Sequence, residues 1–139
     1  MNVTRVTNIG QLGETLAKEY LIKNGFKIIA QNFRKPYGEI DIIATRNNTL
    51  HFCEVKAVTC EIPSSSNGLI SRVPDDLIPE ENVHEKKLLR LGRVVQAYLA
   101  KLEEEKEWQF DVIAVFIDKK TKKALIRYTA DVVLNPQKS

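Results

Sequence analysis

Apolar residues recur at helical spacing in two stretches of the chain. Residues 10–24 show this spacing and end just before Gly25, a residue typical of helix C-caps, so they predict a first helix. Residues 83–105 predict a second, longer helix with one apolar stripe. The apolar positions are Leu12, Leu16, Tyr20 and Leu21 in the first stretch and Leu88, Leu91, Val95, Tyr98 and Leu102 in the second.

Five short runs rich in strand formers surround these helices. They are residues 26–33, the two arms of a hairpin within residues 38–56, residues 108–117 and residues 124–129. The resulting order favours an α/β domain in which helices pack on a mixed sheet. Residues 60–82 contain three prolines and a serine triplet, so we expect a long loop there. A chain of 139 residues fits one domain spanning residues 1–139.

The predicted hairpin carries charges inside its apolar pattern. If Asn47–Asn48 forms the turn, Asp41 faces Glu54 across the ladder. Glu39 then faces Lys56 on the same side of the sheet, because side chains alternate along each strand. The opposite side reads as ordinary core, with Ile40, Ile42, Ala44, Cys53 and Val55. Like charges directly across a ladder destabilise it, so something must offset the repulsion between the two facing carboxylates.

A shared proton, the nearby Lys56 or a divalent cation could supply that offset. Magnesium suits the arrangement, because it takes one or two carboxylates, keeps several waters and leaves room for phosphate oxygens. Lys56 would orient or deprotonate the attacking water, or neutralise charge in the transition state. The alternative is a set of surface salt bridges on an exposed sheet face. Like charges clustered among apolar residues are typical of a site, so we favour the first interpretation.

The charge pattern permits a nucleic-acid partner without requiring one. The net charge is only +3, but Lys86, Arg90 and Arg93 line one face of the second predicted helix. Arg34 and Lys35 add two cations in the turn before the hairpin. We expect these five side chains to contact phosphates. For the helical stripe, a solvated and merely solubilising face is the alternative.

The N-terminal sequence and the lengths of the apolar runs indicate the cellular location, whereas the cysteines, His51 and Trp108 are given no catalytic role. The chain begins without the layout of a signal peptide, and its apolar runs are too short for a membrane span, so we expect a cytoplasmic protein. Cys53 and Cys60 lack the spacing of a zinc site, and we expect both to be reduced and structural. His51 is expected on the core side of the sheet without a partner, and Trp108 as an anchor at the core edge.

Several short motifs occur together in this chain. They are G-x-x-G-E at residues 10–14, G-F-x-I…N-F-R at residues 25–34, GEIDIIA at residues 38–44, F-x-E-V-K at residues 52–56, K-x-x-x-L near Lys86, and F-D-V at residues 110–112. With these motifs the chain resembles the YraN-like family of uncharacterised bacterial proteins. The G-E-I-D and E-V-K strands are also similar to the PD-(D/E)xK core of the restriction-endonuclease-like superfamily.

The resemblance implies a restriction-endonuclease-like fold of three layers, with a mixed central sheet flanked by helices. It implies a metal site made by Asp41, Glu54 and the carbonyl of Val55. By the same resemblance, Lys56 is the catalytic lysine, and Glu14 is an acid on the first helix that assists the metal.

The hypothesis is therefore a nuclease dependent on Mg²⁺ or Mn²⁺ that cuts DNA, with branched or junction DNA as the resolvase-like substrate. Glu39 belongs to the same motif and counts among the candidate catalytic residues. A resolvase needs two active sites, so a homodimer is the expected assembly. The alternative is a nucleic-acid-binding or partner-binding module that keeps the scaffold without turnover. The family usually has Thr-Arg or a similar pair after E-V-K and Arg before F-D-V, whereas this chain has Ala57–Val58–Thr59 and Gln109. These departures remove a cation or hydroxyl available to phosphate, which fits the alternative.

Overall fold

The structure is a computed structural model that describes residues 8–62 and 85–134. Its helices and strands follow one another in the predicted order. They are α1 (Ile9–Lys23), β1 (Lys27–Lys35), β2 (Gly38–Arg46), β3 (Thr49–Thr59), α2 (Glu85–Leu99), β4 (Glu107–Asp118) and β5 (Lys123–Thr129). Most of the predicted loop lies outside the described residues. In the described ranges, no helix is long and apolar enough to cross a membrane.

The helix ends follow local chemistry. Asn8 caps α1 by accepting a hydrogen bond from the Gln11 backbone N–H at 3.2 Å, and Gly25 follows the helix with a positive φ of 86°. The second helix is shorter than predicted and ends at Leu99. The predicted end reached into a run of glutamates at residues 103–105. Negative charge opposes the dipole at a helix C-terminus, so this run favours termination.

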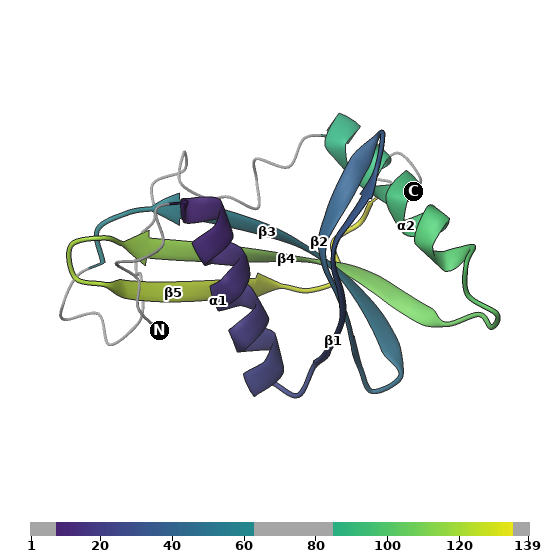
Figure 1. Ribbon diagram of the computed structural model, residues 1–139, viewed down its shortest axis with the longest axis horizontal. Coiled ribbons are helices and arrows are strands. Elements are labelled where there is room, and N and C mark those ends of the chain that lie inside the picture. Colours follow the sequence, from purple (N-terminus) through teal and green to yellow (C-terminus); the bar gives the residue numbers. More distant parts are fainter. Residues whose placement is uncertain (1–7, 63–84, 135–139) are drawn as a thin grey trace.

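The five strands form one sheet in the order β1-β2-β3-β4-β5. Neighbouring strands are antiparallel except β3 and β4, which run parallel over their full lengths and are connected through α2. In Figure 1 the β1–β2 pair is turned steeply against the other three strands. One helix covers each face, which confirms the predicted α/β fold of three layers and is consistent with a restriction-endonuclease-like domain.

Each helix packs on its own core. Under α1, the strands contribute a buried set on one face of the sheet: Ile42, Ala44, Cys53, Ile113, Val115 and Ile117. Under α2, they contribute a set on the other face: Ile40, Ile43, Leu50, Phe52, Phe110 and Val112. Burial of these side chains on both faces supplies the main stabilisation of the layers.

The placement of Ile40 corrects one prediction. Strict alternation placed Ile40 and Ile42 on the same face, but Ile40 packs towards α2 and Ile42 towards α1. The neighbouring strand β1 is irregular here: its register shifts between Ile28 and Ala30, and Asn32 has a left-handed φ of 54°. Such irregularity bends the paired strands and breaks the two-residue period.

The hairpin turn itself is as predicted, but its ladder is shorter. Asn47 and Asn48 both have positive φ, as a two-residue type I′ turn requires. The ladder between β2 and β3 then runs from Arg46 opposite Thr49 to Ile42 opposite Cys53 and ends there. The predicted ladder pairs further along the hairpin are therefore absent, because β3 stays with β4 while β2 turns away with β1 (Figure 1).

Close packing of α1 on β3 depends on Gly13. A Cβ added at Gly13 would lie 2.6 Å from the Cβ of Ala57, well inside contact distance. Gly13→Ala should therefore lower the free energy of unfolding, by the roughly 1–3 kcal/mol typical of overpacking. The sign is diagnostic, because replacing a helical glycine by alanine normally stabilises by about 1 kcal/mol.

Thermal and urea unfolding of the Gly13→Ala protein would test this contact. Gly92→Ala on α2 is a matched control, since its added Cβ would meet only the Leu134 side chain, at an ordinary contact distance of 4.0 Å. A Gly13→Ala protein as stable as the control would contradict the close approach.

Candidate active site

Four elements surround one cavity of about 440 Å³ that contains the charged motif residues. The first half of α1, the beginning of β2, the second half of β3 and the first turns of α2 line it. Its lining residues are Gly10, Glu14, Tyr37, Gly38, Glu39, Asp41, Glu54, Val55, Lys56, Ala57, Lys87, Arg90 and Leu91. All five predicted catalytic residues therefore lie together, as does Val55.

Asp41 lies where β2 leaves β3. Its Oδ2 accepts a hydrogen bond from the backbone N–H of Val55 at 2.7 Å. This side-chain hydrogen bond follows directly after the last backbone pair of the β2–β3 ladder, Ile42 with Cys53. Asp41 as a whole residue is 9% exposed. Burial, the neighbouring negative charge of Glu54 and a hydrogen bond with Glu54 raise the pKa of Asp41 to about 8, although the Val55 N–H opposes the rise. The predicted proximity of the two carboxylates is thus present without a ladder pair between them.

Two amino groups lie against the Glu54 carboxylate. Lys87 forms an ion pair with it, and Lys56 Nζ lies 3.9 Å from Glu54 Oε2. A hydrogen bond with Lys87, together with burial and the charge of Lys87, lowers the pKa of Lys56. Burial also disfavours the charge of Lys87, but hydrogen bonds with Glu54 and Lys56 outweigh it and raise the pKa of Lys87. Lys87, the closer of the two amines to Glu54, therefore keeps its proton more firmly than Lys56 does.

The other two acidic residues lie at the rim of the cavity. Burial, followed by the negative charges of Glu39 and Glu54, raises the pKa of Glu14. The predicted pairing of Glu39 with Lys56 is wrong: Glu39 Oε2 accepts a hydrogen bond from Arg34 at 2.9 Å. Arg34 and Glu39 face each other in the β1–β2 ladder, which explains why Glu39 pairs with Arg34 and not with Lys56.

The predicted phosphate-binding cations lie at different distances from this cavity. Arg90 lines it, whereas Arg93 lies over the Tyr37 ring at 4.2 Å and lines a separate groove. Arg34 is engaged by Glu39, and Lys35 lies 5.5 Å from the centre of the Phe33 ring. Lys86 is exposed at the beginning of α2.

Lys87 is a site residue that the sequence reasoning missed. It lines the cavity and forms an ion pair with Glu54, whereas the sequence analysis named only Lys86, Arg90 and Arg93 on this helix. A signal was present, because Lys87 precedes the apolar-stripe residue Leu91 by four positions and so lies on the same helical face.

The expectation that His51 has no partner is also wrong. Asp111 is fully buried, and its Oδ2 lies 2.7 Å from His51 Nδ1 and accepts a hydrogen bond from the Tyr128 hydroxyl. Its Oδ1 accepts hydrogen bonds from Gln109 Nε2 and from the Asp131 backbone N–H. The F-D-V motif therefore supplies a polar connection between β3, β4 and β5. A lone Asp in a buried strand signals such partners, since burying it without hydrogen bonds is costly.

The donor set of the cavity fits a hard divalent cation. In residues 8–62 and 85–134, no three His, Cys, Asp or Glu side chains converge closely enough to chelate an ion by side chains alone. Magnesium does not require that, because it accepts one or two carboxylates with water and phosphate oxygens. Two buried carboxylates that repel each other, Asp41 and Glu54, match this requirement.

Comparison with known proteins agrees with the motif resemblance. The model of "Uncharacterised protein family UPF0102" matches residues 13–115. A UPF0102 protein of Caldicellulosiruptor bescii is 38% identical over 125 residues, which cover 88% of this chain and 94% of that relative. A UPF0102 protein of Alkaliphilus oremlandii is 41% identical over 118 residues, covering 82% of this chain and 90% of that relative. The matches confirm the YraN-like resemblance.

The raised pKa of Asp41 predicts a pH-dependent stability. In the unfolded chain the carboxyl group loses its proton near 3.8, whereas in the folded protein it does so near 8. The folded state therefore holds more protons between these values, and ionisation of Asp41 costs stability as pH rises through this window. Asp41→Asn removes the charge but keeps an oxygen for the Val55 N–H.

Melting temperatures of wild type and Asp41→Asn, measured without divalent ions, would test this. The melting temperature of Asp41→Asn, relative to that of the wild type, should rise steadily as pH rises from about 5 to about 9. Glu19→Gln, an exposed carboxylate change on α1, is the control and should show a constant difference. If the difference in melting temperature between Asp41→Asn and the wild type were also constant, the pKa of Asp41 would not be raised by folding.

Proposed function

This chain belongs to the uncharacterised protein family UPF0102, and from that premise we propose that it is a metal-dependent nuclease that hydrolyses DNA phosphodiesters. The observation that carries the proposal is the convergence of Asp41, Glu54 and Lys56 in one cavity. Two buried carboxylates with an adjacent amine of lowered pKa are costly to maintain in a purely structural role.

Asp41 and Glu54 would hold the ion, with the Val55 carbonyl as the third protein ligand that the family resemblance suggests. Mg²⁺ or Mn²⁺ bound there would polarise a phosphoryl oxygen and lower the pKa of a bound water. Glu14 lies close enough to share in the negative field that attracts the cation. Burial and the negative charges of Glu39 and Glu54 raise the pKa of Glu14, so a bound cation would favour its ionised form.

The side chains around the carboxylates supply the remaining chemistry. Lys56, with its lowered pKa, can accept a proton from water or hold a phosphate oxygen in its charged form. Lys87 and Arg90 place positive charge beside the cavity, where a phosphate group would develop additional negative charge during attack. Release of Lys87 from Glu54 would free that carboxylate to act as a ligand.

Branched or junction DNA is the substrate class that the resolvase-like motifs suggest. Cutting two strands of a junction requires two active sites, which a homodimer with twofold symmetry would provide. The proposal therefore includes a dimer for junction cleavage, whereas nicking or trimming of a single strand needs only one chain.

One observation favours a second function, a nucleic-acid-binding module without turnover. Glu54 already has an ion pair with Lys87, and a neutralised carboxylate is a weaker metal ligand. In this case Lys56, Lys87 and Arg90 would bind a phosphate directly, with a strong dependence of affinity on salt.

A cleavage assay separates the two functions. Labelled duplex, single-stranded, flap and four-way-junction DNA would be incubated with Mg²⁺ or Mn²⁺ and wild type, Lys56→Ala, Asp41→Asn or Lys27→Ala protein. The nuclease proposal predicts metal-dependent cutting that Lys56→Ala and Asp41→Asn reduce by at least about 100-fold, the scale of a lost acid–base group. Lys27 is exposed at the beginning of β1, so Lys27→Ala should cut like the wild type.

No cutting of any substrate by the wild type, with DNA binding retained, would refute the nuclease and leave the binding module. Equal cutting by all four proteins would point to a contaminating nuclease instead of this site.

A further inference from the structure

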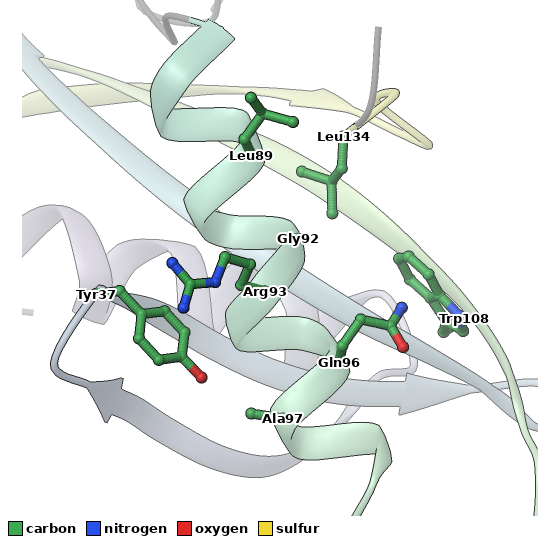
Figure 2. Close-up of a pocket in the computed structure, with 8 residues that line it drawn as sticks. All are labelled: Tyr37, Leu89, Gly92, Arg93, Gln96, Ala97, Trp108 and Leu134. Carbon is green, nitrogen blue, oxygen red and sulfur yellow. The ribbon is translucent and has the colours of Figure 1, made fainter. Parts of the chain in front are cut away.

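A second hollow lies on the outer face of α2, next to the candidate active site. It has a volume of about 670 Å³, within the range of roughly 300–1,000 Å³ common for small-molecule sites. Figure 2 shows its residues: Tyr37 and Arg93 lie on one side of α2, Gln96 and Trp108 on the other, and Gly92 between them. Leu89, Ala97 and Leu134 complete the lining. We call this hollow the α2 groove.

The α2 groove adjoins the active-site cavity at Tyr37. Tyr37 lines both hollows, and Arg90, which lines the active site, precedes the groove residue Arg93 by three positions on the same helix. A chain with phosphates at Lys87 and Arg90 would therefore meet Arg93 next. The positive charges lie in a row that leads from the site into the groove.

The chemistry of the groove suits an unpaired nucleobase. Trp108 packs edge-on against Phe52 with ring centres 5.9 Å apart and is 37% exposed, so it lies at the core edge, as the sequence predicted, with part of its ring open to solvent. An exposed indole is a good surface for base stacking. Gln96 extends towards Trp108 in Figure 2 and offers both a donor and an acceptor for a base edge.

The charge of the groove also fits a nucleic acid. Among the described residues, none of the eight that line the groove is acidic, and the guanidinium of Arg93 is held over the Tyr37 ring at 4.2 Å. Beyond Trp108 the surface becomes acidic, because Glu103, Glu104 and Glu105 line the adjoining hollow. The cations Lys87, Arg90 and Arg93 thus attract an anionic strand along α2, and the glutamates beyond Trp108 repel it.

We propose that the α2 groove binds an unpaired nucleotide of the DNA strand that passes through the active site, with its base stacked on Trp108. This inference rests on the nuclease proposal for the path of that strand. It narrows the substrate to DNA with a single-stranded segment at the cleavage point, such as a flap or fork, because a base inside a continuous duplex is not free to enter the groove.

Trp108 is the sole tryptophan of the chain, so its fluorescence reports on the groove directly. Full-length Asp41→Asn protein in EDTA would be titrated with a short oligothymidylate, with an abasic strand of the same length and with blunt duplex. The inference predicts quenching by oligothymidylate, and little quenching by the abasic strand or the duplex. Gln96→Ala and Trp108→Phe, each checked for an unchanged fold by circular dichroism, should weaken binding of fluorescein-labelled oligothymidylate, Trp108→Phe by up to about tenfold. The matched change Lys27→Ala should not.

Three outcomes would overturn the inference. Equal quenching by the abasic strand would mean that phosphate attraction alone brings DNA there. Binding of oligothymidylate without quenching would place the bases elsewhere. A fluorescence change that follows protein concentration in the absence of DNA would show a second copy of the chain in the groove. None of these outcomes depends on cleavage, so a failure here is distinguishable from a failure of the nuclease proposal.

Discussion

The arrangement of the site depends on one hydrogen bond, from the backbone N–H of Val55 to the carboxylate of Asp41. It forms where β2 separates from β3, at the point where the next backbone pair would otherwise lie. A carboxylate that replaces a ladder partner satisfies a strand N–H and is itself held in place. Because the strands diverge beyond this point, Glu54 and Lys56 are not covered by β2 and can line a cavity.

The helices close this opening, and glycines set how near they come. Gly13 brings α1 onto Ala57 of β3, while Gly38 lies against Val94 of α2, where an added Cβ would be 3.1 Å away. The close approach of the helices buries Asp41 and Glu54. Burial disfavours the ionised form of a carboxyl group and raises the pKa of Asp41. The same packing brings Lys87 against Glu54. The charge conflict at the site is therefore a consequence of how tightly the layers pack, and a divalent cation would relieve it.

The order of the elements and part of the site could be predicted from local patterns, whereas Glu14 and Val55 came only from the motif resemblance. Strand alternation and the Asn47–Asn48 turn indicated that Asp41, Glu54 and Lys56 lie in one region. Their pairing could not be predicted, because the separation of β2 from β3 depends on the parallel pairing of β3 with β4, whose partners are far apart in the chain. The same holds for Lys87, which reaches Glu54 only through the packing of α2.

The polar cluster around Asp111 was missed for a related reason. His51, Asp111 and Tyr128 come from three strands, and only the full sheet shows that they meet. The local pattern placed a histidine on a core face and an aspartate in an apolar run, but it did not show that these two side chains contact each other. This cluster connects the strands beneath α1, away from the cavity residues, so we interpret it as structural.

Binding of Mg²⁺ is the most direct test of the central claim that Asp41 and Glu54 form a site in need of a cation. Melting temperatures of wild type, Asp41→Asn and Glu19→Gln would be measured at pH 8 (about the pKa of Asp41) over a range of Mg²⁺ concentrations. An ion at about 100 times its dissociation constant should stabilise the folded wild type by about 2.7 kcal/mol. The account predicts this shift for wild type and Glu19→Gln and its loss in Asp41→Asn. Equal shifts in all three proteins, or none in any, would contradict it.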